Sequence, residues 1–170
     1  MSDDPHIREA TLEDRAAIGR LWQELMEFHY QLDLRAFEMR EDALEIWLRW
    51  LDEWLTDPDR IVLVADTGHE LVGYIMGKPD EGPPVFKGRH YGAIHDTCVA
   101  ASCRRRGVGR KLVAALLDWF RERGLTEVHV GAAAYNPVSN AFWRKMGFQP
   151  HMIQMRRHIT TSRSPTDQPR

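Results

Sequence analysis

Basic residues and glycines are concentrated in one short segment, between Cys103 and Lys111, where a helix is predicted to begin. The first turn of a helix has unpaired backbone N–H groups and the positive end of a dipole worth about half a charge, so basic side chains are unfavourable there unless an anion is bound. Gly107 and Gly109 carry no side chain that would keep a phosphate from those amides. The segment therefore predicts a phosphate-binding site. Its basic residues are Arg104, Arg105, Arg106, Arg110 and Lys111.

Two common phosphate-binding motifs do not match this segment. The spacing of a Walker loop is absent, and a dinucleotide fingerprint would need glycine or alanine at position 112, which is Leu112. A nucleic-acid patch and a solvated basic face are alternative interpretations of the arginines. We favour a cofactor phosphate because it explains the glycine spacing and the start of the helix together.

The secondary structure predicted around the segment places it at the end of a strand. Apolar patterning predicts a strand over 91–99, a helix over 108–123 and a strand over 127–131, which together form a right-handed parallel crossover. The fold class is therefore α/β. The other elements predicted from the same patterns are strands over 7–10, 61–65, 71–76 and 149–159, and helices over 11–29, 40–55 and 138–146. Tryptophans in the helix over 40–55 recur at helical spacing, which favours core packing over an aromatic ligand box.

Length and charge limit the classes of protein that fit. The chain of 170 residues predicts one domain over 1–159, followed by a polar tail over 160–170 that we expect to be disordered. A formal net charge of −2 gives no reason to expect nucleic acid as a partner, and no apolar run approaches the length of a membrane span. The acidic start is unlike a signal peptide, so we expect a cytoplasmic protein. Cys98 and Cys103 lack a second pair at metal spacing, so we expect no metal.

Two segments resemble the GNAT (GCN5-related N-acetyltransferase) superfamily. The order Arg104-x-x-Gly107-x-Gly109 is similar to its Arg/Gln-x-x-Gly-x-Gly/Ala loop, and the segment from Asn136 to Phe148 is similar to its downstream Asn, Ala and Gly-Phe pattern. The resemblance covers nearly the whole chain in the order of its elements. It implies a GNAT fold, with a mixed, mostly antiparallel central sheet of six to seven strands, a central parallel βαβ crossover and about four flanking helices.

The resemblance also implies how acetyl-CoA would bind as a cosubstrate. In the family, the strand before the basic loop pairs with the pantetheine arm, the loop amides hold the pyrophosphate, and the second segment approaches the pantetheine. For Asn136 and Ala141, tight helix packing is the alternative explanation. Carried over to this sequence, the implied cofactor-binding residues are Thr97, Cys98, Val99, Arg104, Arg105, Arg106, Gly107, Val108, Gly109, Arg110, Asn136, Ala141 and Trp143.

The catalytic residues are less well defined. Trp143 stands where the family commonly places the tyrosine that protonates the leaving thiolate, and an indole N–H is no usable acid. Tyr135 is a candidate replacement, with solvent or the departing ammonium as alternatives. His95, four residues before Val99, is similar to a histidine through which arylalkylamine acetyltransferases remove a proton by way of water; a structural role is the alternative. Strand alternation places Asp96 on the opposite face from His95 unless the strand bulges.

We therefore hypothesise an acetyl-CoA-dependent N-acetyltransferase in which a primary amine attacks directly in a ternary complex. The alternative is a non-catalytic GNAT-fold module that binds acyl-CoA as a sensor or regulator, and Trp143 in place of tyrosine favours it. Nucleic-acid binding through residues 104–111 is a third interpretation, which the overall charge disfavours. The acceptor stays open among small amines, antibiotics and proteins, and so does a homodimer.

Overall fold

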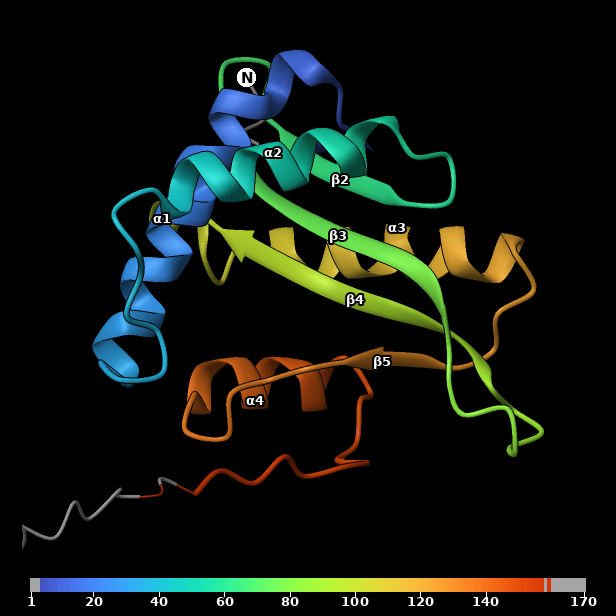
Figure 1. The fold of residues 1–170 in the computed structure, drawn as a ribbon. Coiled ribbons are helices and arrows are strands. Elements are labelled where there is room, and N and C mark those ends of the chain that lie inside the picture. Colours follow the sequence, from blue (N-terminus) through green and yellow to red (C-terminus); the bar gives the residue numbers. More distant parts are fainter. Residues whose placement is uncertain (1–3, 158, 160–170) are drawn as a thin grey trace, which may run out of the picture.

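One mixed sheet, with its strands in sequential order, forms the centre of the fold (Figure 1). The structure is a computed structural model that describes residues 4–157 and 159. Neighbouring strands from β1 to β4 are antiparallel, and β5 is parallel to β4. The strands are β1 (His6–Glu9), β2 (Ile61–Asp66), β3 (Leu71–Glu81), β4 (His90–Val99) and β5 (Val128–Val130).

Helices cover both faces of this sheet. In Figure 1, α1 and α2 lie together on one face, α3 crosses the other face, and α4 lies beside β5. Two short 3₁₀ turns, Leu12–Asp14 and Ala101–Cys103, precede α1 and α3. Among the described residues, no helix combines the length and the apolar character needed to cross a membrane. Residues 4–157 form four α-helices, which are α1 (Arg15–Leu32), α2 (Ala43–Thr56), α3 (Val108–Glu122) and α4 (Pro137–Lys145).

Alternate side chains of β2 divide the core into two layers. Successive side chains of a strand point to opposite faces. Ile61 and Leu63 pack in the layer that contains the buried side of α3, whereas Val62 and Val64 pack in the layer beneath α1 and α2. A strand buried on both faces reads as a continuous apolar run, which explains the sequence Ile-Val-Leu-Val-Ala.

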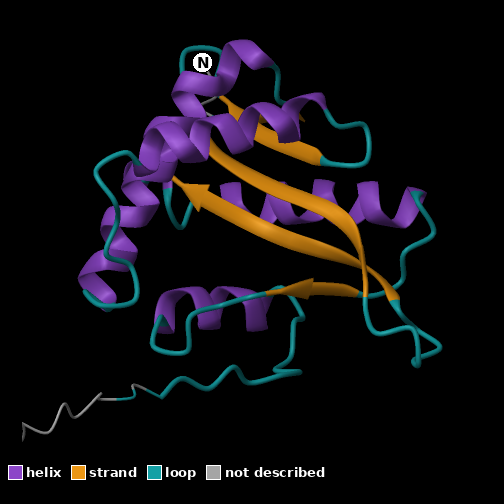
Figure 2. Ribbon diagram, viewed as in Figure 1, coloured by secondary structure: helices purple, strands orange, loops and turns teal. Residues whose placement is uncertain are grey.

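The two parallel strands separate toward the carboxyl end of β4 (Figure 2). Pairing between β4 and β5 is limited to Gly92–Ile94 opposite Val128–Val130. From residue 95 onward, β4 is paired only with β3. The side of β4 that faces β5 therefore presents backbone N–H and C=O groups over residues 95–99. This is the part of the chain where the sequence predicts a cofactor-binding strand.

Most predicted elements are present, but the predicted last strand is wrong. Residues 149–157 and 159 form no strand, so the described residues hold five strands rather than six to seven. The apolar residues of this segment have high strand propensity, yet a strand needs a partner edge. β5 has only three residues, too few to template a long partner. The Arg156 guanidinium instead pairs with Asp33 at the end of α1, at 2.9 Å. The tail over 160–170 lies outside the described residues.

Candidate active site

A β-bulge in β4 changes which side chains share a face of the sheet. Gly77 pairs with Ile94, and Met76 pairs with Asp96, so His95 is an extra residue without a cross-strand partner. A bulge of this kind breaks the alternation of a strand at one position. Two neighbouring residues, His95 and Asp96, can therefore face the same layer.

Side-chain contacts show that His95 and Asp96 both lie on the face covered by α1 and α2. The His95 ring packs edge-on against Trp54 of α2, with 4.9 Å between the ring centroids. The Tyr74 hydroxyl, buried beneath the same helices, donates a hydrogen bond to the Asp96 carboxylate at 3.1 Å. Thr97 resumes the alternation, and its hydroxyl donates to the Tyr74 carbonyl.

A cavity of about 1120 Å³ lies between the carboxyl half of β4, the start of α3, the segment after β5 and the start of α4. The separation of β4 from β5 opens this space. Thirteen of the fifteen predicted site residues line it. They are His95, Thr97, Cys98, Val99, Arg104, Arg105, Arg106, Gly107, Val108, Gly109, Arg110, Asn136 and Trp143.

Two predicted site residues lie elsewhere. Tyr135 and Ala141 are exposed and line neither this cavity nor the second one described below. The Tyr135 side chain is 55% exposed. The small residues that do form the cavity wall follow β5, at Gly131, Ala132 and Ala133.

The backbone amides at the start of α3 are available to an anion. From Arg105 to Arg110, no backbone N–H group donates to an acceptor among the described residues, and the first to do so is that of Lys111, which bonds the Gly107 carbonyl at 3.1 Å. Arg105 and Gly107 have positive φ angles, of 62° and 89°, which turn the chain sharply into the helix. Six free amides beside a cavity, at the positive end of a helix dipole, suit a diphosphate.

The arginines of this loop have two different roles. The Arg104 side chain donates to the Val99 carbonyl at 3.0 Å and approaches the Glu24 carboxylate of α1 at 3.3 Å, so it fixes the loop to β4 and α1. The Glu24 carboxylate also accepts a hydrogen bond from the backbone N–H of Ala101, in the 3₁₀ turn, at 2.7 Å. The guanidinium groups of Arg105, Arg106 and Arg110 are exposed, and no ion pair joins them to a described residue. These three remain available to a phosphate.

The glycines of the loop also act differently. Gly107 caps α3 with a φ of 89°, a left-handed conformation that other residues adopt only at a cost. At Gly109, a β-carbon would come within 3.3 Å of the Phe142 ring of α4. The absence of a side chain at Gly109 therefore lets α4 close the cavity wall, which is a packing role in addition to the predicted opening of the amides.

Asn136 and Trp143 form the α4 side of the cavity. The buried Asn136 side chain accepts a hydrogen bond from the Ser139 backbone at 2.9 Å and so caps α4. Its amide nitrogen has no acceptor among the described residues, although the residue lines the cavity. The Trp143 ring is buried edge-on between Phe142 and Phe148 and also reaches the cavity.

A second cavity, of about 540 Å³, opens between α1, α2 and the segment before α2. Trp47 and Trp50 line it, so these two tryptophans are not purely core residues as predicted. The ring of Trp47 stacks on Trp22, with 4.9 Å between centroids. Among the residues that the structure describes, only His95 and Asp96 line both cavities. The two cavities therefore meet at the bulge in β4.

Burial tunes the two titratable groups at this junction. Burial raises the pKa of the Asp96 carboxyl to about 6, against a smaller opposing effect of the Tyr74 hydrogen bond. Partial burial of its ring lowers the pKa of His95, and the positive charge of Lys78 lowers it further. At neutral pH both groups are therefore able to accept a proton.

The bulge explains why sequence reasoning gave His95 rather than Asp96 as the candidate base. Simple alternation turns Asp96 away from His95, and nothing in the sequence marks the extra residue. His29 was also missed. It lines the larger cavity, and its Nδ1 atom is buried without a hydrogen-bond partner among the described residues. Burial lowers the pKa of His29.

Proteins similar in sequence to this chain are named as acetyltransferases. Over 115 residues, 65% of this chain, the sequence is 32% identical to mycothiol acetyltransferase of Nocardia farcinica, and over 86 residues it is 28% identical to N-acetyltransferase 8F1 of Rattus norvegicus. The matched segments span only 36% and 38% of those two proteins. An uncharacterised N-acetyltransferase of Bacillus subtilis, YhfO, is 24% identical over 85% of this chain and 89% of its own length.

Solved structures share the fold at low identity. A mutant of the BH1408 protein from Bacillus halodurans superposes with a TM-score of 0.83 and 22% identity, over 91% of this chain and 99% of that one. The aminoglycoside antibiotic 6'-N-acetyltransferase AAC(6')-IG from Acinetobacter haemolyticus gives a TM-score of 0.70 and 19% identity over the same shares. The family model described as "Acetyltransferase (GNAT) family" matches residues 20–148. The chain therefore belongs to the GNAT acetyltransferase family.

Proposed function

We propose that this protein is an acetyl-CoA-dependent N-acetyltransferase that acts on a primary amine in a ternary complex. The observation that carries the proposal is the meeting of two cavities at His95 and Asp96. One cavity offers free backbone amides and unpaired arginines for a diphosphate. The other is lined mainly by apolar and aromatic side chains and suits a separate acceptor. Two substrates bound at once would meet beside two proton acceptors.

The larger cavity fits acetyl-CoA by its chemistry. The amides of residues 105–110, with the side chains of Arg105, Arg106 and Arg110, would hold the pyrophosphate. The edge of β4 over residues 95–99, apart from the Val99 carbonyl that Arg104 already bonds, and the Asn136 side chain would hold the pantetheine arm. Bound there, acetyl-CoA supplies an activated acetyl thioester. The names of relatives and structural neighbours, which include a neighbour solved in complex with CoA, support this assignment.

Proton removal is the chemistry that this chain supplies. A protonated amine must lose one proton before it can attack the thioester, and its nitrogen loses a second proton as the amide forms. The site therefore needs a base close to the acceptor nitrogen. Asp96 lies at the junction with a pKa near 6, and His95 beside it is the base proposed from the sequence. We propose that one of the two takes the proton, directly or through water, and passes it to solvent along the smaller cavity.

Direct attack is favoured over a covalent acyl-enzyme. Cys98 is the buried thiol of the larger cavity, and burial raises its pKa to about 12. A thiol that is protonated at neutral pH is a poor nucleophile. Tyr135 is exposed and outside both cavities, so its position gives no support to a role as proton donor to the departing thiolate. We propose that solvent, or the protonated nitrogen of the tetrahedral intermediate as it becomes the amide, supplies that proton to the leaving thiolate.

The experiment is a thiol-release assay with acetyl-CoA and a panel of amines. Amines with an aromatic or apolar body, such as phenylethylamine, are expected to be better substrates than spermidine or kanamycin, because Trp22, Trp47 and Trp50 line the acceptor cavity. His95→Ala should lower the rate at least about tenfold, with little change in acetyl-CoA affinity. His90→Ala, a histidine of the same strand outside both cavities, is the matched control. Tight CoA binding without turnover of any amine would instead support an acyl-CoA sensor.

A further inference from the structure

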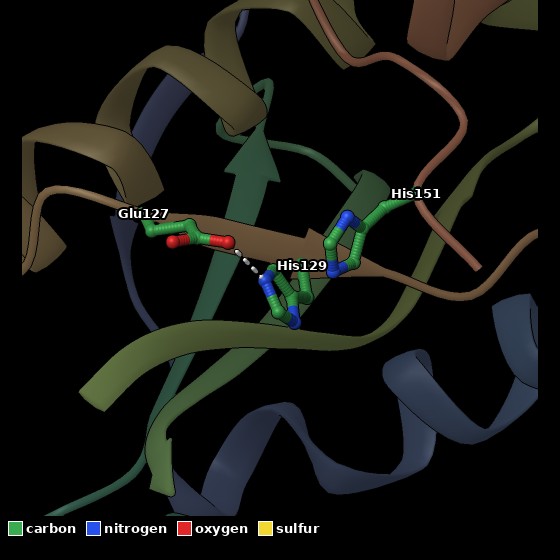
Figure 3. Close-up of side chains that lie close together, drawn as sticks. All are labelled: Glu127, His129 and His151. Carbon is green, nitrogen blue, oxygen red and sulfur yellow. Dashed lines mark hydrogen bonds and ion pairs between the residues drawn. The ribbon is translucent and has the colours of Figure 1, made fainter. Parts of the chain in front are cut away.

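Three side chains of types that can bind a metal ion lie close together on and beside β5 (Figure 3). They are Glu127, His129 and His151, and one ligand atom of each lies within 4.8 Å of the others. Glu127 and His129 already contact each other, with 2.7 Å between the carboxylate and Nε2. None of the three lines either cavity. This cluster has no part in the proposed acetyl transfer.

The fold brings these residues together from two distant parts of the chain. Glu127 and His129 are two positions apart on an extended segment, so their side chains leave the same face of the sheet. His151 comes from the segment that follows α4, and its ring lies 5.4 Å from that of His129. The ring of Tyr91 on β4 stacks on His129 at 4.0 Å and limits its rotation.

The donor set is one that transition metals prefer. Two imidazoles and one carboxylate, with water in the fourth position, are a common ligand set for Zn²⁺, at bond lengths of about 2.0 to 2.2 Å. Donors of a tetrahedral site with such bonds lie about 3.3 Å apart. The present spacing of up to 4.8 Å therefore requires a closure of about 1.5 Å. Glu127 and His151 are exposed, so side-chain rotation can supply it.

We infer that Glu127, His129 and His151 form a binding site for a divalent transition metal of the Zn²⁺ class. The bound metal would hold the segment after α4 against β5. This is the segment in which the predicted last strand is absent. The sequence expectation of no metal rested on the lack of a second pair at metal spacing, and 21 residues lie between His129 and His151. Only the fold places the second histidine beside the first.

Isothermal titration of the full chain with Zn²⁺, free of any histidine tag, tests the inference. We expect one site per chain with a dissociation constant in the micromolar range or below. Loss of a residue that merely orients a ligand costs about 10- to 100-fold in affinity, so His151→Ala should cost at least about 100-fold. His90→Ala is the matched control. His90 is an exposed histidine that also pairs with a carboxylate, that of Glu81 at 3.3 Å, but it does not belong to the group of three possible ligands. An unchanged affinity in His151→Ala, or an equal loss in His90→Ala, would overturn the inference.

Hydrogen exchange provides a second readout that does not depend on catalysis. Zn²⁺ should slow exchange of the backbone amides over residues 149–157 in the wild-type chain and leave them unchanged in His151→Ala. Glu127→Gln, which keeps the shape of the side chain but removes its charge, should weaken Zn²⁺ binding as well. Circular dichroism establishes that each variant is folded. Equal exchange with and without Zn²⁺ in the wild type would show that the metal does not hold this segment.

Discussion

The phenolic oxygen of Tyr74 lies 3.1 Å from the carboxylate of Asp96, across the strand pair β3 and β4. Tyr74 is fully buried, and burial raises its pKa well above the ordinary value, so at neutral pH its hydroxyl is a hydrogen-bond donor. Donation to a carboxylate stabilises the ionised form. Burial of Asp96 has the opposite and larger effect, which leaves its pKa at about 6. The bond therefore keeps Asp96 available as a base near neutral pH.

Tyr74→Phe should move the pH dependence of catalysis toward higher pH. The variant loses the hydrogen bond that lowers the pKa of Asp96, while the burial that raises it remains. If Asp96 is the base, kcat/KM of the wild type should fall below about pH 6. In Tyr74→Phe this fall should begin at a higher pH. Tyr135→Phe, which changes an exposed tyrosine outside both cavities, should leave the profile unaltered. Identical profiles for the wild type and Tyr74→Phe would remove Asp96 from the mechanism.

Asp96→Asn should change stability in a pH-dependent way. The folded-state pKa of Asp96 is raised from 3.8 to about 6, so the wild type loses stability as pH rises between these values. A shift of about 2 units corresponds to about 3 kcal/mol at most. The asparagine variant lacks this loss. Its free energy of unfolding should therefore increase relative to that of the wild type by about 1 to 3 kcal/mol between pH 4 and pH 7. Urea unfolding at both pH values measures the difference, and a difference independent of pH would argue against a partly buried Asp96 that ionises between them.

The fold was largely predictable because its patterns are local. Helical periodicity and strand alternation depend on neighbouring residues, and they placed every helix and the strands β1, β2, β4 and β5 within a few positions of those observed. The strand predicted over 71–76 was too short, because β3 continues to Glu81 in its pairing with β4. The loop of arginines and glycines was recognisable for the same reason. Thirteen predicted site residues line one cavity.

Features that depend on pairing between distant segments were not predictable. The bulge at His95 arises where the register between β3 and β4 shifts by one residue. The sequence pattern of either strand alone does not indicate this shift. The predicted strand over 149–159 failed because strand propensity does not reveal whether an edge is available. The packing role of Gly109 depends on Phe142, which approaches from α4. Each of these required the tertiary structure.

Gly107→Ala should weaken CoA binding beyond its effect on stability. The φ angle of 89° disfavours a β-carbon by about 1 kcal/mol, and the added methyl group adjoins the amides proposed to hold the pyrophosphate. Gly124→Ala is the matched control, because Gly124 follows the other end of α3 with a φ of 74° and open space around it. Both variants should lose similar stability in thermal unfolding. Only Gly107→Ala should lose affinity for CoA, at least about tenfold by calorimetry.

Similar CoA affinities for Gly107→Ala and Gly124→Ala would contradict the assignment of the pyrophosphate to this loop. The outcome would separate binding from stability, because the backbone cost is common to the two variants.

Ile46→Ser should raise the KM of an acceptor amine with an apolar body and leave the KM of acetyl-CoA unchanged. Ile46 lies on α2, lines only the smaller cavity and is 39% exposed, so its replacement should affect folding little. Removal of its contact with an apolar acceptor is worth about 1 kcal/mol, or about fivefold in KM. Leu34→Ser is the control, since Leu34 is 59% exposed and lines neither cavity. Equal effects of the two variants, or a change in the KM of acetyl-CoA alone, would place the acceptor outside the smaller cavity.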